Sequence, residues 1–218
     1  MRKWSVLFSA ALMLSAATLA HAAGMHKGAS MLAIQLNEGT GDFVGNDGSA
    51  GYLPAYDHSE IGLQLQYWHF MSPDYAFNVT GGLGFFSEKD EPGAAAPPAA
   101  PDNKYSQHSW QVQVGGDRFA QVNDRFAVFG GPGIQFWGGQ STLFQDTAAE
   151  MKTASVLRVA LTGRVGAMLK LNQSVSMIAQ VGHYLGHASA SGKGATSTWW
   201  PSGNTGACGV VFNFGGRE

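Results

Sequence analysis

Two histidines and a serine lie close together near the C-terminal end of the chain. His183, His187 and Ser189 are spaced by even numbers, so on a β-strand their side chains point to one face. Two imidazoles can begin a metal site, but the neighbouring sequence offers no third ligand, and we expect no metal. Gly82-Leu83-Gly84 is followed by no helical pattern, so we also expect no nucleotide cofactor.

Three charged residues form the second candidate group. Arg158 and Arg164 lie on the polar face of one predicted strand, and Asp117 lies on the polar face of another. In a narrow, enclosed interior such side chains need partners. We therefore expect these residues to form a structural ion pair that fills the lumen. The alternative is a narrow ion-conducting pore lined by Arg158 and Arg164.

Alternating apolar and small or polar residues define the elements that position both groups. Ile61, Leu63 and Leu65 share one face of a predicted strand, whereas Gln64 and Gln66 share the other. The same period of two occurs in about eight segments, at residues 31–37, 60–70, 75–85, 108–115, 126–136, 157–169, 175–182 and 207–214.

The composition indicates which face of these strands meets solvent. Charged residues make up 13% of the chain, against about 25% in soluble domains. A water-facing sheet, as on a soluble lipocalin-type barrel, is usually rich in charge, whereas small groups that hydrogen-bond to one another suit a confined interior. The polar face carries seven glutamines: Gln35, Gln64, Gln66, Gln111, Gln113, Gln135 and Gln180. We therefore predict a barrel with its apolar face outward, in lipid.

The connections alternate in length, as in bacterial membrane barrels. Tight turns are predicted at 72–74, 123–124 and 172–173, and long links at 42–59, 87–107, 139–154 and 186–200. Two places interrupt the pattern. Pro132 predicts a β-bulge in its strand, and Phe119 breaks the parity of its strand, which indicates a bulge or a slip near Gly115-Gly116. An even number of strands puts both termini in the periplasm.

Aromatic residues cluster at the strand ends on the apolar face and predict a belt at each lipid–water boundary. The periplasmic belt comprises Tyr67, Tyr75, Phe126, Phe212 and Phe214, and the outer belt comprises Phe85, Trp110 and Phe136.

The N-terminus has the features of a signal peptide. Arg2 and Lys3 precede an apolar run over 6–19, and Ala20-His21-Ala22 matches the cleavage pattern. We predict a cut after Ala22, export by the general secretory route, and one domain over 23–218. The net charge of −2 gives no basic footprint for nucleic acid.

On these patterns the chain resembles the small eight-stranded outer-membrane barrels of the OmpA/OmpX type, the outer membrane protein β-barrel domain family. The resemblance implies an all-β, closed, antiparallel up-and-down transmembrane barrel in a Gram-negative outer membrane. It implies contact with outer-membrane lipids, lipopolysaccharide and the assembly machinery, and a structural or surface-contact role without catalysis. A closed barrel has no free edge, so we expect a monomer.

One further resemblance is local. His187-Ala188-Ser189 is similar to the His-x-Ser element of outer-membrane lipid A deacylases, which implies Ser189 as nucleophile and His187 as its base. The sequence departs from that family because Ala190 follows the serine and no Asp or Glu lies between Ser189 and Phe214. A lipid-modifying hydrolase is therefore the alternative function.

Overall fold

The computed structural model describes residues 25–40, 59–90, 103–143, 151–152, 155–192 and 195–214. The predicted signal peptide over 1–22 and its cleavage site after Ala22 lie outside the described residues. So do residues 41–58, which cover nearly all of the first predicted long link. Among the described residues, no helix is long and apolar enough to cross a membrane.

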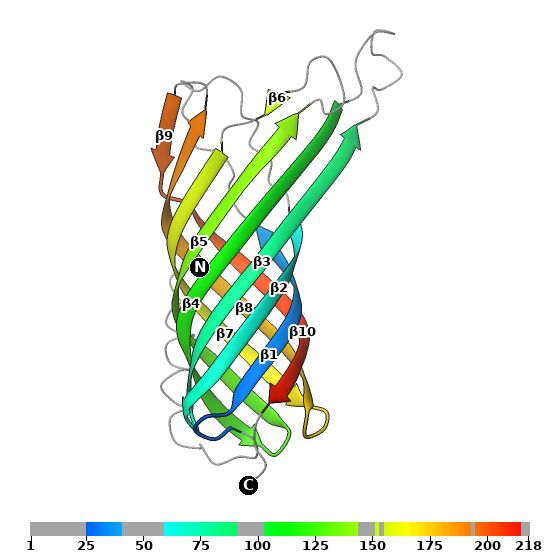
Figure 1. Cartoon of the computed structure of the whole chain (residues 1–218), viewed down its shortest axis with the longest axis vertical. Coiled ribbons are helices and arrows are strands. Elements are labelled where there is room, and N and C mark those ends of the chain that lie inside the picture. Colours follow the sequence, from blue (N-terminus) through cyan, green and yellow to red (C-terminus); the bar gives the residue numbers. More distant parts are fainter. Residues whose placement is uncertain are drawn as a thin grey trace, which may run out of the picture.

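Eight long strands close into a ring, which confirms the predicted barrel (Figure 1). The hydrogen-bonded order is β10-β1-β2-β3-β4-β5-β7-β8, and pairing between β8 and β10 completes the circle. All pairs are antiparallel, and two short strands, β6 and β9, pair with β5 and β8 at the end that carries the long links. The strands are β1 (Ser30–Thr40), β2 (Ser59–Ser72), β3 (Tyr75–Asp90), β4 (Asn103–Asn123), β5 (Phe126–Leu143), β6 (Met151–Lys152), β7 (Ser155–Lys170), β8 (Val175–Gly192), β9 (Ala195–Trp199) and β10 (Ser202–Phe214).

Several strands run further than the sequence pattern predicted. The links expected over 87–107, 139–154 and 186–200 are shorter, because β3 continues to Asp90, β5 to Leu143 and β8 to Gly192. Alternation of apolar and polar residues indicates where a strand faces lipid, whereas pairing between β-strands needs only main-chain hydrogen bonds. The strands therefore continue beyond the region where side chains alternate.

The barrel is apolar outside and polar inside. On the outer face Leu36, Leu63 and Leu161 are 60%, 53% and 68% exposed, whereas Gln35 and Gln64 on the inner face are 1% and 6% exposed. A water-soluble barrel would show the reverse. The outer face is therefore a wall suited to lipid.

The bulge expected at Pro132 is wrong. Pro132 faces outward and lies opposite Gly163, in a register between β5 and β7 that is unbroken. Between β4 and β5 the register is the same on both sides of the proline. A Cβ atom at Gly131 would overlap the carbonyl oxygen of Gly116, so glycine allows these two strands to stay close despite the missing N–H group.

The bulge expected near Phe119 is also wrong. Phe119 has the same parity as the inward-facing Asp117, and it is 2% exposed inside the barrel. The register of β4 shifts only beside the turn, between Gln121 and Asn123. The prediction failed because it treated the interior as uniformly polar.

The interior is apolar near the short turns, where four rings form a cluster that we call the aromatic plug: Trp68, Phe70, Phe119 and Phe129. Phe119 lies between Phe70 and Phe129, with ring-centroid distances of 5.0 and 5.2 Å. Trp68 meets Phe129 edge-on at 5.9 Å. Met31, Met168, Ile178 and Val211 surround these rings and are also buried. This packing fills the cross-section of the barrel at the short-turn end.

Candidate functional site

A buried ion pair lies next to the aromatic plug, on the side of the plug that faces the long links. Asp117 on β4 is fully buried and Arg164 on β7 is 6% exposed. Arg164 donates from Nε to Oδ1 at 3.1 Å and from Nη2 to Oδ2 at 2.5 Å. Trp68 Nε1 and Asn78 Nδ2 also donate to Oδ2, at 2.7 and 3.1 Å. The carboxylate thus joins strands β2, β3, β4 and β7 across the lumen.

This arrangement satisfies both charges. A buried pair stabilises a fold only when further hydrogen bonds replace the lost hydration of each ion. Asp117 has donors from three residues, and the amide oxygen of Gln66 can face Arg164, 2.7 Å from Nη2. Asp117 and Arg164 therefore connect strands across the lumen, and neither charge is left without hydrogen-bond partners.

A second hydrogen-bond network lies nearer the end of the barrel that carries the long links, and Arg158 belongs to it. Arg158 Nη2 donates to Gln135 at 3.1 Å, and its guanidinium lies 3.9 Å from the ring centroid of Tyr184 and 5.0 Å from that of Trp137. Contact with two aromatic faces is favourable for a desolvated guanidinium. Of the two predicted lumen arginines, only Arg164 forms an ion pair with Asp117.

Glutamine side chains continue this second network across the barrel. Gln135 Nε2 donates to Gln111 at 2.7 Å, and Gln111 Nε2 donates to Gln64 at 3.1 Å. β3 lies between β2 and β4 in the sheet, and a Cβ atom at Gly82 would lie 2.9 Å from Gln111 Nε2, so glycine leaves room for this bridge. The relay from Arg158 to Gln64 ties four strands together.

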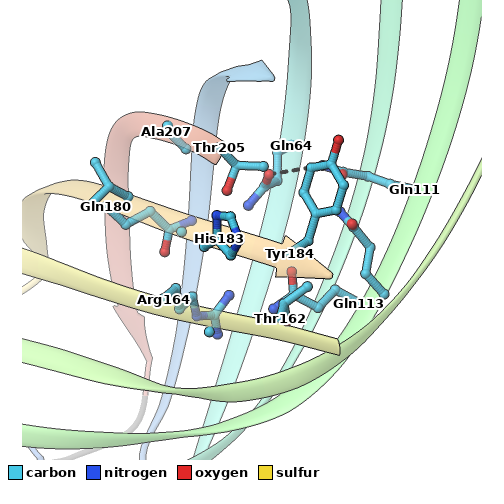
Figure 2. A pocket seen from close by; sticks show the side chains of 15 residues that line it. Gln64, Gln111, Gln113, Thr162, Arg164, Gln180, His183, Tyr184, Thr205 and Ala207 are labelled. Atoms are coloured by element: carbon cyan, nitrogen blue, oxygen red, sulfur yellow. Dashed lines mark hydrogen bonds between the residues drawn. The ribbon is translucent and has the colours of Figure 1, made fainter. Parts of the chain in front are cut away.

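A small polar cavity of about 40 Å³ lies inside the barrel (Figure 2). Glutamines, Thr162 and Arg164 line it. This volume holds about three water molecules. Thr162 Oγ1, on the cavity lining, is buried without a hydrogen-bond partner among the described protein groups. The geometry suits trapped water better than a substrate.

The residues of the hydrolase hypothesis lie on the outside of the wall. His187 is exposed on β8, and its ring meets Trp200 edge-on with centroids 5.3 Å apart. Ser189 lies two residues further along β8, opposite Leu157 of β7 and Thr198 of β9. Among the described residues, no group of three His, Cys, Asp or Glu side chains is placed to hold a metal ion.

The residues expected to form aromatic belts all lie on the outer face. Phe126 is half-buried, and the others are exposed: Tyr67, Tyr75, Phe85, Trp110, Phe136, Phe212 and Phe214. Tyr67 also hydrogen-bonds through its hydroxyl to Ser30 Oγ at 2.8 Å.

Solved structures of outer-membrane proteins share this barrel architecture. Outer membrane protein OprG from Pseudomonas aeruginosa is similar over 89% of this chain and 100% of its own, with a TM-score of 0.56 and 14% sequence identity. The chain has the fold of the small outer-membrane β-barrel proteins. Another protein with this barrel, the attachment invasion locus protein Ail of Yersinia pestis in complex with the heparin analogue sucrose octasulfate, aligns at a TM-score of 0.49. Its sequence identity is 12%, over 86% of this chain and 99% of that one. No protein-family model and no curated protein matches the sequence.

Sequence reasoning missed two of the partners of Asp117 inside this barrel. Trp68 and Asn78 hold Asp117, yet neither was predicted to contact it. A signal was present, because Trp68, Phe70 and Phe119 are large residues on the polar parity of their strands. Large apolar residues on an otherwise small and polar face indicate a plugged interior.

Proposed function

We propose that the protein is an integral outer-membrane barrel with a non-conducting lumen, whose wall supports the envelope and whose long links contact the surroundings. The observation that carries this proposal is the filled interior. The aromatic plug and the Asp117–Arg164 pair occupy the lumen at successive levels, and Trp68, Phe70 and Asp117 are fully buried. An eight-stranded barrel is only wide enough for its own side chains, whereas porins need about 16 strands.

The outer face supports a place in a membrane. Exposed leucine, valine, isoleucine and aromatic side chains cover every long strand, which in water would drive aggregation. We propose that the outward aromatic residues form belts at the two lipid boundaries. The lipid contacts would be phospholipid near the short turns and lipopolysaccharide near the long links.

The orientation follows from the connections. β1 begins and β10 ends at the short-turn end (Figure 1). We propose that this end faces the periplasm after export by the general secretory route and insertion by the outer-membrane assembly machinery. The closed ring has no free edge for a partner strand, and we propose a monomer.

Bilayer recordings test the closed lumen. The wild-type barrel should give no current steps between −100 and +100 mV. A variant with Phe119→Ala and Phe129→Ala still keeps the Asp117–Arg164 level, so conduction should appear only when Asp117→Ala and Arg164→Ala are added to it. A wild-type barrel that conducts as well as this combined variant would show that the plug and the ion pair do not seal the lumen. Recovery of folded wild-type protein in the soluble periplasmic fraction would refute the membrane assignment.

A further inference from the structure

A polar pair interrupts the lipid-facing wall on strands β8 and β10. His183 and Asn204 lie opposite each other, both are exposed, and Nδ1 of His183 lies 3.0 Å from Oδ1 of Asn204. On β8 the outward neighbours of His183 are Val181 and Leu185, which are 61% and 55% exposed. On β8 the pair is therefore flanked by apolar residues in both directions along the strand.

Two glycines make room in front of this pair. Gly163 lies opposite His183 on β7, and Gly206 follows Asn204 at the next outward position of β10. A Cβ atom at either glycine would have no heavy atom within 4 Å. We call the four residues His183, Asn204, Gly163 and Gly206 the polar notch. Its flanks are bulky, since Leu161 on β7 is 68% exposed.

The hydrogen bond within the notch determines what the histidine offers to lipid. An amide oxygen can only accept, so Nδ1 carries the proton that His183 donates to Asn204. The lone pair is then on Nε2. A polar atom facing hydrocarbon without a partner is costly, and an ionisable residue within a membrane-spanning segment is a candidate functional site.

We propose that the polar notch binds an acyl chain that carries a hydroxyl group, the chemistry of the 3-hydroxyacyl chains of lipopolysaccharide. The hydroxyl donates to Nε2 of His183, and the glycines let the chain approach the backbone. His183 lies at the middle of β8, and Asn204 and Gly206 lie on the long-link half of β10, which faces the lipopolysaccharide leaflet in the orientation proposed above. An ordinary phospholipid chain has no donor at this depth and cannot supply the bond.

The test compares lipid retention by the full mature barrel and two variants. Native mass spectrometry counts the lipopolysaccharide molecules of a defined rough type that remain bound after detergent exchange. His183→Leu should lower retention about threefold to tenfold, the value of one hydrogen bond. His187→Leu is the matched control, because His187 is also lipid-facing on β8 but lies against Trp200, and it should change retention less than twofold.

A second readout keeps the proposal independent of folding. The ¹⁵N resonance of Nε2 in His183 should shift between nanodiscs of lipopolysaccharide and nanodiscs of phosphatidylglycerol, while that of His187 should not. Equal retention by wild type and His183→Leu overturns the proposal, and so does equal retention of phosphatidylglycerol. A two-copy complex lost in His183→Leu would assign the notch to self-association instead. None of these outcomes depends on whether the lumen conducts.

Discussion

Removing the Asp117 carboxylate should destabilise the barrel more than any other single charge deletion among the described residues. Asp117→Ala leaves Arg164, which is 6% exposed, without its anion, and leaves the Trp68 and Asn78 donors without their acceptor. Breaking a buried pair from one side costs about 3–5 kcal/mol. We expect this loss in the free energy of unfolding, because Gln66 can offer Arg164 only a neutral oxygen.

The assay is reversible urea unfolding in lipid vesicles, followed by tryptophan fluorescence and by the electrophoretic shift of the folded barrel. Combining Asp117→Ala with Arg164→Met should recover much of the loss, because no unpaired charge then remains. Asp74→Ala serves as the control. It removes the partner of Arg118, whose side chain is 58% exposed, and should cost about 0–1 kcal/mol. A loss below 1 kcal/mol for Asp117→Ala would refute the reasoning.

Four further outcomes follow from the same contacts. Phe119→Ala should lower the unfolding free energy by about 3–5 kcal/mol in the same urea assay, because it leaves a cavity in the aromatic plug. Leu161→Arg on the lipid face should cost about 2–4 kcal/mol in vesicles, and a cost near zero would contradict a membrane-embedded wall. The hydroxyl of Ser72 donates to Asp74 and lowers the pKa of that carboxyl, with burial opposing this shift and Arg118 adding to it. The stabilising effect of the ionised Asp74 carboxylate is therefore complete above the pKa of the unfolded state and is lost as the pH falls through the lower pKa of the folded state. The difference in unfolding free energy between wild type and Asp74→Asn should be constant from pH 7 to 5 and shrink below about pH 4. Ser189→Ala should leave the lipid A mass spectrum of expressing cells unchanged, and loss of an acyl chain only with the native serine would establish the hydrolase alternative.

The strand count and the facing of nearly every strand could be predicted because both follow from a period of two. Leu63 and Gln64 belong to opposite faces whatever the rest of the fold does, and their exposures agree with this. The ends of the strands were less predictable. β8 continues through Ser189 to Gly192, where main-chain pairing persists although the residues no longer report a lipid-facing wall.

The interior contacts needed distances that no sequence pattern contains. Arg158 and Arg164 lie on the same face of one strand and look equivalent in sequence, yet only Arg164 meets Asp117. The difference arises because the antiparallel register sets which residues of β4 and β7 reach the same level of the lumen, across the intervening β5. Pro132 shows the same limit, since its effect on the ladder depends on the adjoining Gly131 and on how closely Gly116 of the neighbouring strand approaches it.

The sequence by itself determined an all-β chain of alternating strands, joined by alternating short and long links, with a polar face too poor in charge to meet water. These properties are local, since each depends on neighbouring residues and on the pleat of a single strand. Only the tertiary structure decided that the lumen is plugged by four rings, that Asp117 pairs with Arg164, and that His183 meets Asn204 on the wall. Each of these contacts joins residues from different strands, and the register of a closed barrel, rather than proximity in sequence, brings them together.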